Sequence, residues 1–336
     1  MTAEEPRRGI LALGNLLVDK MHRINAYPPE SFLAVINASA ASPGGGVLNV
    51  LFDLARLDPS LPLAAAGLVG DDADGRFLRD ECAARGIDTR RVGTAPGLPT
   101  SFTQVMISEH NATRTFFHAH GANSRFGLDQ VRAAAGPERI AHLAYLLLLE
   151  GLDAPDGDYG SGGAHALALL RSMGFRTSLD LISDPDLERY RQFALPALRH
   201  TDFLIINEVE AASLTGLAPA VGADRVDWSG AFGHAERLLE LGVGELVAIH
   251  FPQGAVAATR AGERAQQGSL MLPKAEIAST LGAGDAFCAG MLFGLHQGAA
   301  LARCLQLALG MARCNLQAES ATGGAVPLER LLEAID

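Results

Sequence analysis

The chain has almost no lysine. Of its 27 basic residues only Lys20 and Lys274 are lysines, and its 38 acidic residues give a formal net charge of −11. A Walker A phosphate loop requires Gly-Lys-Ser/Thr, but Asp19 precedes one lysine and Pro273 precedes the other. The absence of a Gly-Lys-Ser/Thr motif excludes a P-loop nucleoside triphosphatase. The acidic balance predicts no nucleic acid partner and no anionic membrane partner, because both would be repelled.

Cysteine and long apolar runs are also scarce. The four cysteines have no C-x-x-C spacing, so the sequence offers neither a disulfide framework nor a zinc pattern. We expect each cysteine to be a small buried side chain in a reducing, cytoplasmic compartment. The most apolar run, 143–149, is far shorter than the roughly 18 residues of a membrane span, and the short charged N-terminus lacks the pattern of a secretory signal.

What the sequence does contain is an alternation of short apolar runs with amphipathic stretches, in a chain that is 48% hydrophobic. Periodicity predicts strands at 10–14, 64–69, 143–149, 177–182, 203–206 and 246–249, and helices at 47–57, 75–85, 164–173, 285–295 and 301–316. Two β-rich runs, 102–107 and 113–117, predict a hairpin. Unbroken apolar strands between helices indicate an α/β fold with a mostly parallel sheet covered on both faces.

The segment 279–287, Ser-Thr-Leu-Gly-Ala-Gly-Asp-Ala-Phe, carries the strongest chemical signal. Gly282 and Gly284 let the backbone approach a ligand closely, and the first N–H groups of the predicted helix have no partner within it. The helix dipole adds positive potential, so this turn can hold a phosphoryl group. Asp285 stands where it can accept a proton from an attacking hydroxyl. Taken alone, the same residues also suit a capped tight turn.

Other polar residues follow predicted strands or open predicted helices. Gly45 and Asn49 lie in a second glycine-rich helix start, and the Asn49 amide can both donate to and accept from sugar hydroxyls. Asp19 follows the first strand, and Glu150 is expected to end the run 143–149 and so to point into the crevice beyond the sheet. The segment 207–210, Asn-Glu-Val-Glu, follows another strand, and its carboxylates can hold a hydrated Mg²⁺.

In their order and spacing these segments resemble the ribokinase-like (PfkB) carbohydrate kinase family. The resemblance runs from about residue 9 to 327 and includes the segments 67–72 and 121–123 as well as those described above. It implies a single domain over 1–336 with a Rossmann-like central sheet and a small β-sheet lid formed by about 15–42 and 98–124. It also implies ATP-dependent, Mg²⁺-requiring phosphorylation of a hydroxyl on a sugar or sugar-like molecule, and a homodimer formed through the lid.

The resemblance also assigns roles to individual residues. Asp285 would be the catalytic base, with Gly282, Ala283 and Gly284 as the anion hole. The residues expected to hold the substrate are Asp19, Gly45, Asn49, Glu150 and Arg114. Those expected at the ATP site are Asn207, Glu210, Gly254, His250 and Asn315, with Glu210 also serving Mg²⁺.

The sequence departs from the family pattern in two places. Ser279 stands where members activated by monovalent cations carry an aspartate, so we predict no strong activation by K⁺. The nucleotide-side segment 249–255 keeps Gly254 but contains Pro252, which removes a backbone donor. His250 is a candidate replacement donor. This second change motivates an alternative hypothesis, a catalytically weak sugar-binding or regulatory protein on the same scaffold. A dehydrogenase is excluded because no Gly-x-Gly-x-x-Gly follows a predicted strand.

Overall fold

A nine-stranded sheet forms the centre of the computed structural model, which describes residues 6–111, 113–222 and 225–335. Its strands are β1 (Ile10–Gly14), β4 (Leu63–Val69), β5 (Asp88–Thr94), β8 (Ile140–Leu146), β11 (Arg176–Leu181), β12 (Phe203–Asn207), β13 (Leu246–Phe251), β14 (Gly254–Thr259) and β15 (Arg264–Gly268). They lie in the order β15-β14-β13-β12-β11-β8-β1-β4-β5. All neighbours from β5 to β13 are parallel, and only the pairs β13–β14 and β14–β15 are antiparallel, so β14 alone runs opposite to the other strands. The predicted mostly parallel sheet is confirmed.

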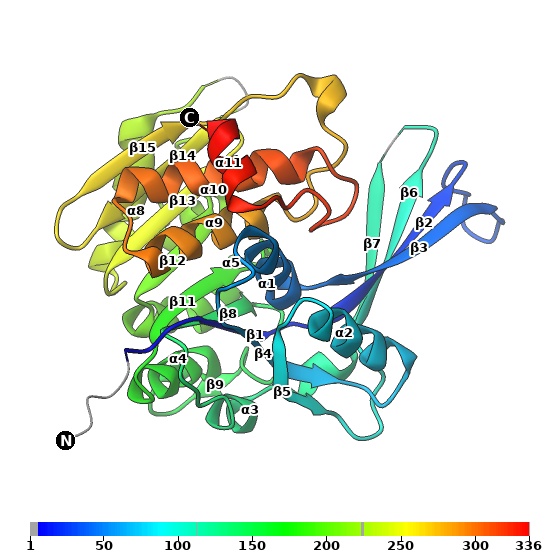
Figure 1. Ribbon diagram of the computed structural model, residues 1–336, viewed down its shortest axis with the longest axis horizontal. Helices are drawn as coiled ribbons and strands as arrows, with labels where there is room; N and C mark the ends of the chain where they lie inside the picture. Colours follow the sequence, from blue (N-terminus) through cyan, green and yellow to red (C-terminus); the bar gives the residue numbers. More distant parts are fainter. Residues whose placement is uncertain (1–5, 112, 223–224, 336) are drawn as a thin grey trace.

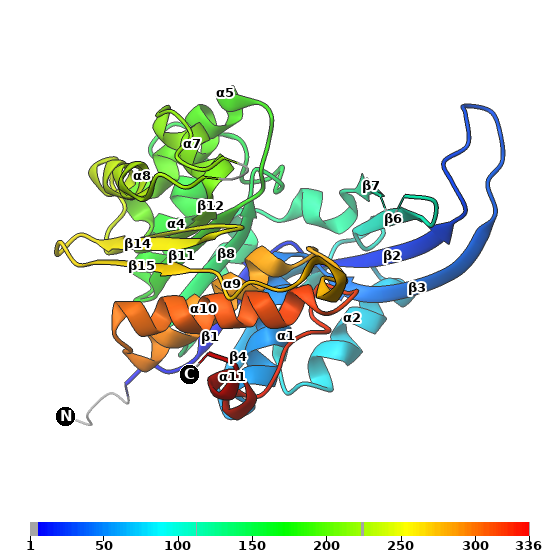
Figure 2. The same cartoon turned by 90° about the horizontal axis from the view of Figure 1, so that it is seen from above.

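Helices cover both faces of this sheet, as the view along its edge shows (Figure 2). One face carries α1 (Gly46–Leu57), α2 (Ala73–Ala83), α9 (Ala283–Gln297), α10 (Leu301–Leu316) and α11 (Leu328–Ile335). The other carries α3 (Leu128–Arg132), α4 (Gly162–Ser172), α6 (Leu195–Ala197), α7 (Glu208–Thr215) and α8 (Trp228–Glu240), with α5 (Leu187–Arg189) beside them. None of the helices in the described residues is long and apolar enough to cross a bilayer.

Two cores follow from the alternation of side chains along the strands. Within β1, Ile10 and Ala12 pack toward α1 and α9, whereas Leu11 and Leu13 pack toward α4 on the opposite face. Because successive residues of a strand point to opposite faces, a strand covered on both sides must be apolar throughout. This is the physical reason why the unbroken apolar runs predicted buried parallel strands.

A second, four-stranded sheet projects from the body (Figure 1). It consists of β2 (Leu17–Ile24), β3 (Ile36–Gly44), β6 (Phe102–Ser108) and β7 (Arg114–Ala119) in the order β3-β2-β6-β7. The predicted hairpin is its β6–β7 pair. Smaller elements are the two-stranded β9 (Pro155–Asp156) and β10 (Gly160–Ser161) and the short helical turns 121–125, 190–194, 198–200 and 274–276.

The strand predicted at 143–149 is displaced. β8 begins at Ile140 and ends at Leu146, and the chain then turns, with Leu147 at a φ of 75°. The N–H groups of Leu147 and Leu149 donate to the Asp153 carboxylate instead of to a neighbouring strand. The prediction that a strand continues to residue 149 is therefore wrong. Leu147 and Leu149 are buried although they lie beyond the strand, so the apolar composition of this run reflects burial and not strand geometry.

Candidate active site

The first turn of α9 is shaped by Gly282, the residue before the helix. Gly282 has a left-handed φ of 78°, and a Cβ there would lie only 2.4 Å from the carbonyl oxygen of Ala321. Both facts require glycine. The Ala283 N–H donates to the Thr280 carbonyl over 3.3 Å, whereas the first N–H groups of a helix have no carbonyl partner within the helix itself. Asp285 lies within this first turn, 6% exposed. A buried carboxylate therefore stands beside a pocket of backbone donors.

Two side chains from other elements hold the Asp285 carboxylate. The Tyr145 hydroxyl at the end of β8 donates to Oδ1 over 2.5 Å. The Asn49 amide in the first turn of α1 donates to Oδ2 over 2.9 Å. Burial raises the pKa of Asp285 to about 6, whereas the hydrogen bonds from Tyr145 and Asn49 lower it. Asp285 is thus ionised at neutral pH and fixed in orientation, as a general base requires.

Further buried carboxylates surround Asp285. Burial, and then the charge of Asp285, raise the pKa of Asp19 to about 7. The same two causes raise the pKa of Asp53 well above its usual range. Asp53 is 1% exposed, and neither of its carboxylate oxygens has a hydrogen-bond partner among the described residues. The crevice is therefore acidic, and its carboxylates favour protons or cations.

A cavity of about 460 Å³ lies on the other side of the α9 turn. Its apolar wall includes Val209, Met271, Leu309, Ala312 and Leu316, and such a slot suits a planar aromatic ring. The cavity reaches Ala283 and Gly284, so a ligand in it can extend to the N–H groups of the turn. His250 lines this cavity beside Gly284, and burial lowers the pKa of His250 to about 4, which leaves its imidazole neutral.

Asn207 and Glu210 form a capping box at the start of α7. Asn207 Oδ1 accepts from the N–H groups of Val209 and Glu210, and Glu210 Oε2 accepts from the Asn207 N–H over 3.0 Å. Glu210 Oε1 accepts from the Asn207 amide and from Ser183 Oγ. Burial raises the pKa of Glu210 to about 7, and the charge of Glu210 contributes to raising the pKa of neighbouring Asp180. Glu210 and Asp180 thus form a pair of neighbouring buried carboxylates.

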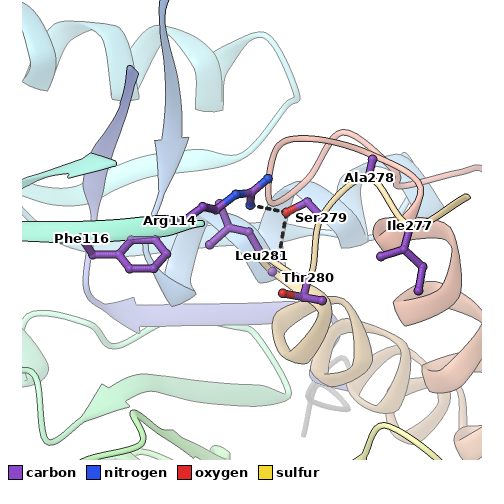
Figure 3. Close-up of a pocket in the computed structure, with 8 residues that line it drawn as sticks. Arg114, Phe116, Ile277, Ala278, Ser279, Thr280 and Leu281 are labelled. Carbon is purple, nitrogen blue, oxygen red and sulfur yellow. Dashed lines mark hydrogen bonds between the residues drawn. The ribbon is translucent and has the colours of Figure 1, made fainter. Parts of the chain in front are cut away.

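The small sheet contacts the segment that precedes α9. Arg114 on β7 donates to Ser279 Oγ over 2.5 Å, and Ser279 Oγ also accepts from the Leu281 N–H (Figure 3). These residues and Phe116 line a cavity of about 580 Å³ that reaches Gly282. Asp19, Thr103 and His118 are cross-strand neighbours on adjacent strands, with Thr103 Oγ1 3.1 Å from His118 Nδ1.

The structure does not bring every predicted residue to this site. Gly254 begins β14 and does not itself line the 460 Å³ cavity, but it pairs with Phe251, which does. The Asn315 amide donates to the Ala321 carbonyl, whereas its neighbours Arg313 and Leu316 line the cavity. Gly45 is the residue before α1, with a φ of 84°.

The expectation that Glu150 ends a strand is wrong, since β8 stops at Leu146. Glu150 lies in the following loop, and its side chain is 56% exposed, with Oε1 3.6 Å from His120 Nδ1. At the end of β8 it is Tyr145, not Glu150, that meets Asp285. The sequence reasoning missed Tyr145 because this polar aromatic residue lies within an otherwise apolar run.

Two buried acids were missed as well. Asp53 lies four residues after Asn49 on the buried face of α1, so a carboxylate on an apolar helix face was the available signal. Asp180 is the last residue but one of β11, near the carboxyl end of a parallel strand, where ligands bind such sheets.

Comparison with known proteins places the chain in a family. Residues 22–327 match the model of the pfkB family of carbohydrate kinases. A 5-dehydro-2-deoxygluconokinase of Shouchella clausii is 24% identical over 86% of this chain and 83% of its own length. An ATP-dependent ribose-1-phosphate kinase of Halopiger xanaduensis is 26% identical over 84% of this chain and 83% of its own length.

Solved structures show the same fold. Arabidopsis thaliana ribokinase in complex with ribose and ATP superposes with a TM-score of 0.79 at 21% identity, covering 98% of this chain and 99% of its own. A Methanocaldococcus jannaschii nucleoside kinase gives a TM-score of 0.74 at 17% identity, covering 98% and 99%. Because the family match spans most of the sequence, the chain belongs to the pfkB family of carbohydrate kinases and is a sugar kinase.

Proposed function

We propose that Asp285 is the general base of this kinase and that residues 282–284 form its anion hole. The observation that supports this most is the buried Asp285 carboxylate, held by Tyr145 and Asn49 beside the first turn of α9. The acceptor hydroxyl gives its proton to Asp285 while its oxygen attacks the γ-phosphorus of ATP. The bond from phosphorus to the ADP oxygen breaks, and the N–H groups of the turn stabilise the charge on the transferred group.

The 460 Å³ cavity would receive the adenine, with His250 and Asn207 on its wall near the phosphates. Glu210 fits a divalent cation held through water, because its carboxylate is buried at the start of α7, next to Asn207 on the cavity wall. We therefore infer that Glu210, acting through water, holds Mg²⁺. When bound, Mg²⁺ neutralises charge on the donor phosphates. The side-chain oxygens of Glu210 already accept hydrogen bonds, which favours contact through water.

The acceptor would lie between the α9 turn and the small sheet, which we infer to be a lid. Asp19 and the unpartnered Oδ1 of Asn49 can accept from sugar hydroxyls. Thr103 and His118 continue the row from Asp19 across the sheet, and Gly45 and Glu150 border it. Such a row of donors and acceptors suits a polyhydroxylated molecule.

We further propose that the acceptor carries a phosphate or carboxylate group. Arg114 lies half-buried at the lining of the 580 Å³ cavity, and within the described parts of the chain it has no carboxylate partner. A guanidinium that meets only a hydroxyl is free to bind an anion with two hydrogen bonds. The similarity to a ribose-1-phosphate kinase supports this choice.

An ADP-release assay over pentoses, hexoses and their phosphates tests these proposals. Asp285→Asn should abolish turnover but keep ligand binding, which is measured separately by calorimetry. Arg114→Gln should raise KM for the preferred sugar phosphate, whereas Arg132→Gln, an exposed arginine paired with Asp129, is the matched control. Binding without turnover of any tested sugar would contradict the role of Asp285. A preference for neutral sugars would contradict only the role of Arg114.

A homodimer formed through the lid is also part of the proposal. The connection from β2 to β3 exposes Phe32 (73%) and Leu33 (85%), and β7 exposes Phe117 (56%). Large apolar side chains left exposed along one projecting sheet are typical of an interaction surface. Sedimentation should give a dimer that Phe32→Ser with Leu33→Ser shifts toward monomer. A wild-type monomer at micromolar concentration would contradict this proposal.

We place the protein in the cytoplasm. All four cysteines are free and buried in the structure, and a chain without disulfides is suited to a reducing compartment. A fluorescent fusion localised by microscopy would test this assignment.

A further inference from the structure

A cluster of metal-binding side chains lies behind the catalytic base. Cys288 follows Asp285 by three residues on α9, and its Sγ lies 3.7 Å from Nε2 of His142 on β8. The carboxylate of Asp180 on β11 completes the group, with all three ligand atoms within 4.8 Å of one another. Cys288 and His142 are fully buried and Asp180 is 8% exposed. Three elements distant in sequence thus bring one sulfur, one nitrogen and one oxygen ligand together.

Neighbouring groups orient two of these ligands. Ser178 Oγ lies 3.0 Å from His142 Nδ1, so Nδ1 can carry the ring proton and Nε2 can keep its lone pair for a metal. Cys288 Sγ lies 3.7 Å from Nε2 and 4.0 Å from Nδ1, so the imidazole must turn to direct that lone pair at a shared ion. Asp180 Oδ1 accepts from the Leu181 N–H over 2.8 Å, which fixes the carboxylate and leaves Oδ2 available. Partners of this kind hold the ligands of protein metal sites in place.

We propose that His142, Asp180 and Cys288 bind a zinc ion. Tetrahedral zinc with bonds of about 2.0–2.3 Å needs ligand atoms about 3.5 Å apart. The distance of 3.7 Å between Cys288 Sγ and His142 Nε2 is close to that spacing. The three ligand atoms lie within 4.8 Å of one another, so the most distant pair would have to approach by about 1 Å at most when zinc binds. A combination of thiolate, imidazole and carboxylate selects zinc over Mg²⁺, because Mg²⁺ prefers oxygen ligands alone.

Binding replaces a proton by a metal and involves no redox change. In the metal-free protein the Cys288 pKa is well above its usual value because of burial and the charges of Asp180 and Asp285. Burial also lowers the pKa of His142 to about 3, so His142 is already neutral. Zinc displaces the thiol proton, which leaves to solvent, and the thiolate and carboxylate together neutralise the ion. The sequence-based expectation that Cys288 is only a small buried side chain would then be incomplete.

The position of the site predicts inhibition. Cys288 lies three residues after Asp285 on α9, so the proposed zinc site and the Asp285 carboxylate are neighbours along one helix. A dication held by Asp180 would attract the Asp285 carboxylate and make it a weaker base. Zinc should therefore reduce kcat even when Mg²⁺ and ATP are saturating, which separates this site from competition for the Mg²⁺ position.

Titration with Co²⁺ in excess Mg²⁺ tests the site without measuring turnover. Because Mg²⁺ fills oxygen-only sites, a thiolate-to-cobalt charge-transfer band reports binding at a cysteine. We expect one Co²⁺ per chain with this band, displaced by Zn²⁺. Cys288→Ser should remove the band, and Cys314→Ser, a buried cysteine outside the cluster, should keep it.

His142→Gln provides a second variant in case Cys288→Ser folds poorly. It should weaken Co²⁺ binding by about tenfold or more, since ligand-shell changes cost at least that much. Circular dichroism of the metal-free variants confirms folding. A wild-type protein without a charge-transfer band, or a band that survives in folded Cys288→Ser or is unchanged in His142→Gln, overturns the proposal. None of these outcomes depends on Asp285 being the catalytic base.

Discussion

Replacing Tyr145 with phenylalanine tests how the site tunes its base. The substitution removes one oxygen atom and with it the 2.5 Å hydrogen bond to Asp285 Oδ1. The hydrogen bond from Asn49 to Oδ2 remains. Because burial raises the Asp285 pKa to about 6 and the Tyr145 hydrogen bond opposes that rise, its loss must raise the pKa further.

The size of the shift follows from the strength of the lost bond. A hydrogen bond to a charged group contributes about 1.5–3 kcal/mol, and one pKa unit corresponds to about 1.4 kcal/mol. The Asp285 pKa should therefore rise by about one to two units. Since a general base works only when ionised, activity is lost as the pH falls through this pKa. The acidic limb of the kcat/KM profile should move from near pH 6 to about pH 7–8.

The assay is ADP release measured from pH 5 to pH 9 on wild type and variant. Tyr159→Phe is the matched control, because Tyr159 stacks on His165 away from Asp285 and its profile should not move. Equal profiles for wild type and Tyr145→Phe would refute the reasoning, as would an acidic limb that moves to lower pH. A lower plateau without a shift would show that Tyr145 positions the substrate rather than the base.

Three further predictions concern neighbouring features. K⁺ added to a medium free of Na⁺ and K⁺ should not activate the enzyme, because Ser279 lacks a carboxylate and already meets the Arg114 guanidinium; a rise of about tenfold, worth about 1.4 kcal/mol at the transition state, would contradict this. Gly282→Ala should lower kcat far more than Gly298→Ala. Both glycines have a left-handed φ, so either substitution costs about 1–2 kcal/mol of backbone strain, but only a Cβ at position 282 would also clash with the Ala321 carbonyl. Equal losses of kcat would show that the structure relieves this clash. Asp53→Asn should raise the melting temperature at pH 8 more than at pH 5. The pKa of Asp53 is raised in the folded protein, so its carboxyl contributes stability when protonated and loses that contribution as the pH rises through the folded pKa. An equal change in melting temperature at both pH values would show that ionisation of Asp53 is not involved.

Much of the architecture could be predicted from the sequence. The helix predicted at 301–316 is observed with those bounds, and the strands at 10–14 and 203–206 differ by one residue at most. These elements are long or strongly periodic, and burial on both faces forces their composition. The turn at 282–285 was also predictable. Its small residues set the backbone conformation, and the acid that follows them places a carboxylate in the first turn of the helix.

The partners of Asp285 were decided only by the tertiary structure. Tyr145 lies 140 residues away in sequence and Asn49 lies 236 away, and neither spacing carries a signal. The same holds for His142, Asp180 and Cys288, each of which fits an apolar or ordinary local context. Local sequence determines which stretch becomes strand or helix and where a glycine is required. Which side chains meet depends on the order of strands in the sheet, which arises from packing over the whole chain, and that packing also sets the burial that shifts the pKa of each acid.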